Sequence, residues 1–231
     1  MPVYNRTQSV HHAIQSILDQ TFDLWELIIV DDGSVDDTER MVKLFKDERI
    51  RYFKRPHKGI SASRNFGNKK ARGQIIVVQD SDDMSFPDRL EEINKYFTSN
   101  PETDYLYHWA YIRAVDIRHG ARAIHREIHR SGAYDRRKAI TVPYIPGQSA
   151  YRKEAVLKYP YREELIAWDD WGLIVDFSMH KLKFGVLEKP LYEYVITGDS
   201  ITTLSDTNGV REKDKATLEN ILRKEYKLDV Q

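Results

Sequence analysis

Three carboxylates stand close together directly after a short apolar segment. Residues 75–78, with the sequence Ile-Ile-Val-Val, predict a strand that is buried on both faces of a parallel sheet, and Asp80, Asp82 and Asp83 follow it. Ligands of open α/β sheets bind at the carboxyl ends of the strands. Clustered carboxylates repel one another, and Mg²⁺ or Mn²⁺ offsets this repulsion while bridging the carboxylates to substrate phosphates. The cluster therefore predicts a cation and phosphate site, with a solvated acidic turn as the alternative.

Elements of an α/β protein surround this cluster. Before residue 100, strand patterns alternate with helix patterns. The expected strands are residues 24–30, 50–54 and 75–78, after a segment at 1–5 that is too short for a full strand. The expected helices are residues 7–20, 36–47, 61–71 and 87–98. Such alternation predicts an α/β fold with a Rossmann-like, doubly wound and mostly parallel sheet.

The second half of the chain has a less regular pattern. It predicts a strand at 104–115, a shaped loop at 142–151, a helix at 168–182 and a short strand at 184–187. A charged amphipathic helix is expected at 210–226. This helix could contact a membrane surface or a partner, although packing on its own domain is favoured. No repeat or linker interrupts the pattern, so we expect one domain over residues 1–231.

Composition excludes several classes of protein. The 231 residues contain 36 Lys and Arg and 36 Asp and Glu, so the formal net charge is zero and a nucleic-acid partner is not expected. There is no Cys, which excludes disulfides and thiolate metal sites. No run approaches the roughly 20 apolar residues of a membrane span, and no secretory signal is visible. The expectation is therefore a soluble cytoplasmic protein.

Six short motifs, in their order and spacing, resemble family 2 glycosyltransferases with the GT-A fold. They occupy the first hundred residues: Pro2–Asn5, Ser16–Thr21, Val30–Thr38, Ser63–Gly67, Ala71–Gly73 and Asp80–Asp83. In the second half the match is looser and rests on Trp168–Trp171 and Tyr194–Thr202. The resemblance implies a single GT-A domain. Residues 1–103 would bind a nucleotide sugar, and a smaller extension at residues 104–231, ending in the C-terminal helix, would bind the acceptor.

The activity that this resemblance implies is metal-dependent transfer of a sugar, of the hexosyltransferase type, with inversion at the anomeric carbon. The donor would be a nucleotide diphosphate sugar, with a UDP-sugar favoured, and the acceptor a glycan or a lipid-linked sugar. Mn²⁺ or Mg²⁺ would bind the diphosphate. The protein would act in cell-surface polysaccharide biosynthesis in the cytoplasm, and peripheral contact would bring it to the inner face of the membrane.

The resemblance also assigns roles in the donor half to individual residues. By analogy with the family, Pro2 and Tyr4 would line the base pocket, Asp32 would accept the base N3–H, Arg64 would approach the nucleotide or its phosphates, Asp80 would face the ribose beside Ser81, and Asp82 would bind the metal.

The acceptor half should supply a general base. An acceptor hydroxyl is a poor nucleophile, so a carboxylate should take its proton, from the side opposite the leaving group. A metal on the diphosphate would stabilise the charge that develops there. By the resemblance Asp170 would be this base, and Asp169 and Trp168 would lie beside the acceptor. Capping of the helix that starts here is the alternative role for Asp170.

Departures from the family's pattern keep other interpretations open. The family has a complete apolar strand before the first motif, so Met1 is expected not to be the natural beginning of the chain. Tyr194–Thr197 lacks the Arg and His that the family often has there. The metal or phosphate contact that these residues would make is therefore not expected from this segment. A degenerate, non-catalytic nucleotide-sugar-binding module is therefore the alternative. A sugar nucleotidyltransferase would need a Gly-rich phosphate loop near the start, which this sequence lacks.

Overall fold

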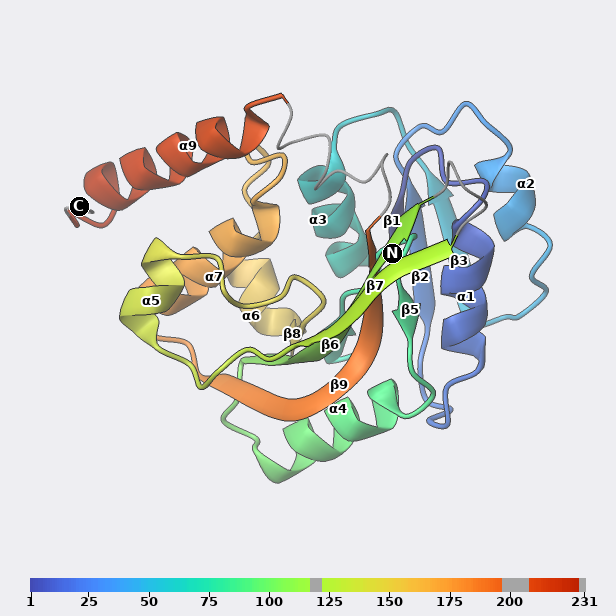
Figure 1. Ribbon diagram of the computed structural model, residues 1–231, viewed down its shortest axis with the longest axis horizontal. Helices are drawn as coiled ribbons and strands as arrows, with labels where there is room; N and C mark the ends of the chain where they lie inside the picture. Colours follow the sequence, from blue (N-terminus) through green and yellow to red (C-terminus); the bar gives the residue numbers. More distant parts are fainter. Residues whose placement is uncertain (117–121, 197–207, 229–231) are drawn as a thin grey trace.

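The computed structural model describes residues 1–116, 122–196 and 208–228 (Figure 1). Most of the Tyr194–Thr202 match, from residue 197 onwards, lies outside these residues. The elements of the first half are β1 (Pro2–Val3), α1 (Val10–Leu18), β2 (Leu27–Asp31), α2 (Thr38–Val42), β3 (Ile50–Lys54), α3 (Ile60–Lys70), β4 (Ile75–Val77), β5 (Met84–Ser85) and α4 (Arg89–Ser99).

The second half contains the expected strands and helices in order, with one strand longer than expected and with two further strands and two further helices that the pattern did not predict. Its elements are β6 (Tyr105–Asp116), β7 (Arg122–His129), α5 (Arg136–Thr141), β8 (Ala150–Arg152), α6 (Lys153–Lys158), α7 (Asp169–Met179), β9 (Phe184–Ile196) and α9 (Val210–Lys224). The strand that was expected to end at Leu187 is β9, and it continues to Ile196. It can continue because the register of its pairing with β6 shifts around Trp109, which faces Pro190. This irregularity accommodates a polar, proline-containing stretch that breaks the local strand pattern.

The first three strands form the parallel sheet that the sequence predicts. Their order is β1-β2-β3, so the carboxyl ends of all three lie at one edge. Leu27 and Ile29 pack with the apolar face of α1. On the opposite face, Gly67 of α3 lies close to Ile28 and Val30. Because side chains alternate between the faces of a strand, helices cover both faces, and the expected doubly wound arrangement is confirmed.

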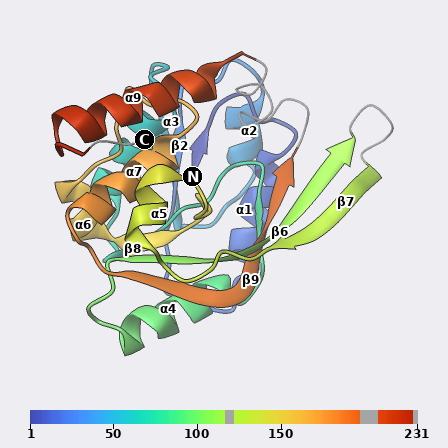
Figure 2. The same ribbon diagram turned by 60° about the vertical axis from the view of Figure 1, so that its left-hand side comes forward.

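The second sheet is largely antiparallel and joins two strands of the first half of the chain to the strands of the second half. Its order is β4-β8-β6-β9-β5, with β7 paired to β6, and only the β6–β9 pair is parallel. The hairpin of β6 and β7 extends away from the body of the molecule (Figure 2). Aromatic side chains of this sheet, Tyr105, Tyr107 and Tyr151, pack against Leu173 and Phe177 of α7. This core fixes α7 relative to the strands.

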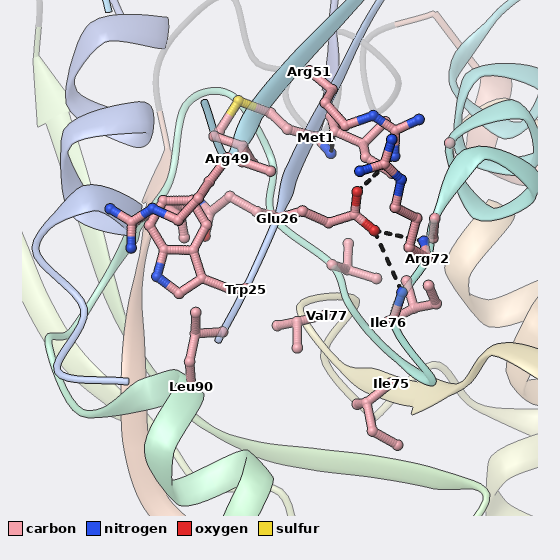
Figure 3. A pocket seen from close by; sticks show the side chains of 18 of the residues that line it. Met1, Trp25, Glu26, Arg49, Arg51, Arg72, Ile75, Ile76, Val77 and Leu90 are labelled. Carbon is pink, nitrogen blue, oxygen red and sulfur yellow. Dashed lines mark hydrogen bonds and ion pairs between the residues drawn. The ribbon is translucent and has the colours of Figure 1, made fainter. Parts of the chain in front are cut away.

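A cavity of about 890 Å³ separates β2 from β4 (Figure 3). Within the described residues no ladder joins the two sheets. Two expectations for β4 are wrong. The strand pairs antiparallel with β8 instead of joining the parallel sheet. Ile75–Val77 are only half-buried instead of buried on both faces, because the cavity lies where a neighbouring strand would pack. The Met1 amino group donates to the Ile28 carbonyl at 2.9 Å, and burial lowers the pKa of this amine to about 5. The cavity thus has the size and the surroundings of a place in the sheet that another strand could fill.

We expect an apolar strand placed ahead of Met1 to fill this cavity and raise the free energy of unfolding. An extension of about five to seven β-branched residues, an ordinary strand length, would replace the buried ammonium by a peptide N–H. Each Val or Ile side chain that it buries contributes roughly 1.5–3 kcal/mol. The check is urea unfolding of this extended chain beside one with a Gly/Ser extension of equal length. Equal unfolding midpoints would contradict the expectation.

Candidate active site

Two of the sequence motifs form one hydrogen-bonded unit where β1 and β2 end. The Asn5 N–H donates to the Ser34 hydroxyl at 2.9 Å, and the Val35 N–H donates to the Asn5 side chain at 3.0 Å. The Arg6 N–H donates to the Thr38 hydroxyl at 2.8 Å. The turn after β1 and the loop after β2 are therefore held together at the carboxyl edge of the parallel sheet, where the donor half was expected to bind its ligand.

The Asp32 carboxylate holds the segment that leads into α3. It accepts hydrogen bonds from the backbone N–H groups of Lys58 and Gly59 at 2.9 and 2.8 Å, and from the Ser63 hydroxyl at 3.1 Å. His57 Nδ1 lies 2.8 Å from it. These four partners match the roughly four acceptor positions of a carboxylate. For Asp32 to accept a base N3–H, one partner must move; of the two side-chain partners, His57 is 58% exposed whereas Ser63 is buried.

A stacked pair of rings lies at the mouth of this region. The Tyr4 and His57 rings are 4.3 Å apart and inclined by 29°. Tyr4 is 43% exposed, so one face of the pair is open to solvent. Pro2 precedes it in β1 and is half-buried. An exposed aromatic face beside hydrogen-bonding groups can stack on the ring of a nucleobase.

Arg64 of α3 joins the two acidic motifs that the sequence singles out. Its guanidinium donates to Asp80 at 2.8 Å and also to the Asp169 carboxylate. Although burial opposes it, the charges of Asp169 and Asp80 raise the pKa of Arg64 well above its usual range. Burial and the Asp80 charge raise the pKa of Asp169, while Arg64 lowers it. The contact brings the end of β4 and the start of α7 together.

Asp170 lies in the first turn of α7, and the pKa of its carboxyl group is close to neutral pH. Burial, and then the charge of Asp169, raise the pKa of Asp170 to about 7, against the opposing effect of Arg64. Its Oδ1 accepts the Trp171 N–H at 2.7 Å. Gly147 packs so closely that a Cβ there would clash with this carboxylate. The N-cap residue of α7 is Trp168, but Asp170 accepts a first-turn N–H group, so a capping contribution of Asp170 stays the alternative to its role as a base.

Trp168 lies next to this acidic pair. Its ring meets the Trp171 ring edge-on at 5.8 Å, and the Arg211 guanidinium of α9 lies 4.4 Å from the ring centre. The residue is only half-buried. Partly exposed indole rings commonly stack on apolar faces of ligands. This position is compatible with the acceptor role that the sequence predicts.

The carboxylates after β4 do not converge as the sequence suggested. Asp80 faces Arg64, whereas Asp82 lies 3.5 Å from the Arg6 guanidinium. Asp83 is fully buried on the other side and accepts from the Gln148 amide and the Val195 N–H, both at 2.9 Å. Ser81 is buried between them. Asp83 is thus part of the interior, and only Asp80 and Asp82 of the acidic cluster are partly exposed.

The residues present fit a divalent cation that would be bound by one protein carboxylate and, for the rest, by substrate phosphates and water. In the described part of the chain no group of three His, Asp or Glu side chains is placed to bind a metal ion. The Asp82 carboxylate is partly exposed and already faces the positive charge of Arg6. Mg²⁺ is often bound by one or two carboxylates together with substrate phosphates and water. One carboxylate at this position satisfies that chemistry.

Sequence patterns did not single out several residues that shape the site. They are Gly147, which packs on Asp170; His57, which stacks on Tyr4; Asn65, which bonds to Tyr161; and Asp214 of α9, which holds the segment before α7. Asn65 belongs to the Ser63–Gly67 motif, which could have drawn attention to it. The other three act through contacts with distant segments, and no local pattern marks them.

Comparison with known families decides the classification. The family described as glycosyl transferase family 2 matches residues 1–159. The chain belongs to this family. None of the described helices is both long and apolar enough to cross a membrane.

Two curated family members illustrate the range of similarity. An uncharacterized glycosyltransferase of Rickettsia bellii is 29% identical over 210 residues, which cover 89% of this chain but 29% of that protein. The Escherichia coli UDP-Glc:alpha-D-GlcNAc-diphosphoundecaprenol beta-1,3-glucosyltransferase WfgD is 39% identical over 92 residues, or 39% of this chain and 36% of that protein. The chain therefore spans about a third or less of the length of these two family members.

Solved structures of other proteins share the fold of this chain. Staphylococcus aureus TarS 1–349 in complex with UDP-GlcNAc has a TM-score of 0.68 and 20% identity, over 96% of this chain and 65% of that one. The mannosyltransferase PcManGT of Pyrobaculum calidifontis, in complex with GDP-Man and Mn²⁺, has a TM-score of 0.63 and 15% identity, over 95% and 61% of the two chains. These likenesses establish the fold, and the predicted GT-A architecture is confirmed.

Proposed function

We propose that this chain is an inverting glycosyltransferase that moves a sugar from a UDP-sugar to a glycan or lipid-linked acceptor. The observation that carries the proposal is Asp170, a carboxylate with a pKa of about 7 beside the cluster of Arg64 and Asp169. A base is most effective when its pKa lies near the working pH. Family membership supplies the reaction class, and this carboxylate supplies the group that the reaction needs.

The proposed reaction is a single displacement. Asp170 takes the proton of the acceptor hydroxyl while the hydroxyl oxygen attacks the anomeric carbon. The bond between that carbon and the diphosphate oxygen breaks, and UDP leaves with the electron pair. Attack from the face opposite the leaving group inverts the configuration. Arg64 holds the segment of Asp80 at a fixed distance from α7, so that the donor and the base meet in one geometry.

The stacked rings and strand-end loops suit the nucleotide part of the donor. The open face of the Tyr4–His57 pair would stack on the base, with Pro2 beside it. Asp32 would accept the uracil N3–H in place of one present partner, and Asp80 and Ser81 would face the ribose. The solved relative TarS was crystallised with UDP-GlcNAc, which supports a uridine nucleotide as the first donor to test.

Asp82 would hold one Mn²⁺ or Mg²⁺ ion together with the diphosphate oxygens. When bound, this ion stabilises the negative charge of the leaving group. The presence of Mn²⁺ beside GDP-Man in PcManGT supports the proposal. The Arg6 guanidinium would then turn from Asp82 towards the diphosphate, so both charges would keep a partner.

The acceptor would lie against Trp168, beside Asp170. The name of the E. coli relative describes a diphosphoundecaprenol-linked acceptor. This supports a lipid-linked sugar as acceptor, with the protein working from the cytoplasm in peripheral contact with the inner face of the membrane. Partly exposed aromatic rings such as Trp168 provide a suitable face for a sugar ring.

Asp82→Asn should abolish the Mn²⁺-dependent part of donor binding while the fold survives. The experiment is a thermal-shift panel of UDP-glucose, UDP-GlcNAc, UDP-galactose and GDP-mannose, each with and without Mn²⁺. A donor at 100 times its dissociation constant adds roughly 2.7 kcal/mol of stability, and we expect UDP-sugars to give the larger shifts. Asp23→Asn is the control, because Asp23 is an exposed carboxylate before the start of β2.

Two outcomes would contradict this account. If Asp82→Asn keeps the Mn²⁺-dependent shift of the parent, the acidic segment after β4 does not hold the cation. If no nucleotide sugar stabilises the parent protein, the proposed function fails. Binding of a UDP-sugar without any release of UDP would instead support a non-catalytic binding module.

A further inference from the structure

The segment that delivers the acidic pair of α7 is held from two sides. On the first side, α3 fixes it through the Ser61 hydroxyl, which donates to the Leu165 carbonyl at 3.0 Å. Asn65 of α3 bonds to both backbone groups of Tyr161, at 2.9 Å each. These contacts fix residues 161–165. They leave the last residues before α7 to be positioned by something else.

The second side is formed by α9, through the carboxylate of Asp214. A single oxygen of Asp214 accepts the backbone N–H groups of Ile166, Ala167 and Trp168, at 2.9, 2.7 and 3.0 Å. Asp214 is 2% exposed. Burying a carboxylate is costly unless hydrogen bonds compensate it, and three successive N–H groups form a concave site that suits an anion. This arrangement is therefore a strong local constraint.

Several apolar side chains together hold α9 against α7. Leu218, Ile221 and Leu222 of α9 pack with Trp171 and other apolar residues around the start of α7. The Arg211 guanidinium lies over the Trp168 ring at 4.4 Å. Figure 1 shows α9 above α7 on the same side of the molecule. Two charged residues of α9 thus bear on the segment immediately before Asp169 and Asp170.

We propose that Asp214 is a positioning residue for Asp170, which is the general base only if the function proposed above holds. The carboxylate fixes the backbone of residues 166–168, and this backbone sets where α7 starts and how Asp170 meets Gly147. The effect should fall mainly on the base and the acceptor side, since the three hydrogen bonds that Asp214 accepts all come from residues 166–168 and none from a residue assigned to the donor. Small displacements of a catalytic group can lower turnover about a hundredfold.

The test compares Asp214→Ala, Asp214→Asn and Leu222→Ala, with release of UDP from UDP-GlcNAc or UDP-glucose in the presence of Mn²⁺ as the assay. Asp214→Ala should lower kcat about 10- to 100-fold and leave the donor KM within about twofold of the parent. Asp214→Asn keeps one oxygen that can accept the three N–H groups, so it should restore most of kcat. Leu222→Ala removes buried packing of the same helix and should lower the Tm with little change in kcat.

Hydrogen exchange supplies a readout that does not depend on turnover. In Asp214→Ala the amides of residues 166–168 should exchange faster, while those of α3 keep their protection. Unchanged exchange at 166–168 would overturn the proposal whether or not the protein turns over. So would an Asp214→Ala variant that loses stability like Leu222→Ala but keeps the parent kcat. Failure of the parent protein to release UDP from any donor would instead reject the proposed function.

Discussion

Asp170→Asn should lower turnover by about 10²–10⁴-fold while donor binding stays within a few-fold of the parent. The amide keeps the size of the side chain and can still accept the Trp171 N–H, but it cannot take up the proton of the acceptor. The measurement is the steady-state rate of UDP release, with donor affinity determined separately by titration. The effect should therefore fall on kcat alone.

Asp169→Asn is the matched control for this variant. Asp169 is the neighbouring carboxylate and is paired with Arg64, so its loss should weaken the cluster without removing the base. If Asp170→Asn turns over normally and Asp169→Asn is inactive, the base is the other member of the pair. If both variants keep full activity, the start of α7 contributes no base.

The pH dependence of the parent protein follows from the same carboxylate. The groups that face it are Asp169 and Asp80, whose charges raise its pKa, and Arg64, which lowers it; burial is the largest influence, and the pKa lies at about 7. Asp170 must be deprotonated to act as a base. Turnover should therefore fall about tenfold per pH unit below pH 7 and level off above it.

Arg64→Met should cause the largest loss of stability among single substitutions in the site. Removing the guanidinium leaves the carboxylates of Asp80 and Asp169 without their shared partner, and Asp169 is 5% exposed. Removing one partner of a buried ion pair typically costs about 3–5 kcal/mol. Urea unfolding at pH 8 measures this loss. Arg40→Met, which alters an exposed Arg of α2, is the control and should stay near the parent.

The loss in Arg64→Met should be smaller at pH 5 than at pH 8. Without Arg64 the folded-state pKa of Asp169 rises further above its value in the unfolded chain, so the folded state binds more protons over that interval. Stability then falls as the pH rises from about 4 through the folded pKa. The acid limb of turnover should also move to higher pH, since Arg64 lowers the pKa of Asp170. An equal loss of stability at both pH values would contradict this ion-pair interpretation.

Local patterns were sufficient to predict the elements that carry the site. The apolar runs of β2 and β4 and the polar residues that follow them are read from neighbouring residues. Parallel pairing brings the ends of β1, β2 and β3 to one edge, whereas β4 pairs antiparallel with β8, a placement that the sequence did not predict. Asp170 was assigned through the family resemblance, as the second member of an acidic pair at a helix start. Its roles and those of the donor residues stay predictions, but their positions at the strand ends and at the start of α7 are as expected.

The features that sequence patterns missed depend on contacts between distant segments. Asp83 was grouped with Asp80 and Asp82, but its partners Gln148 and Val195 are 65 and 112 residues away along the chain. The N–H groups that Asp214 accepts are 46 to 48 residues away. An apolar run such as β4 predicts burial only if strands pack on both sides of it, and the cavity beside β4 shows how that prediction failed.

The most direct test of the account is the configuration of the sugar that the protein releases from an α-linked UDP-sugar when water replaces the acceptor. Proton NMR, recorded early relative to mutarotation, distinguishes the two anomers through the coupling of the anomeric proton. Single displacement with Asp170 as base predicts that the β-anomer forms first and that Asp170→Asn suppresses its formation. Initial release of the α-anomer, or β-anomer release at the parent rate by Asp170→Asn, would contradict the account.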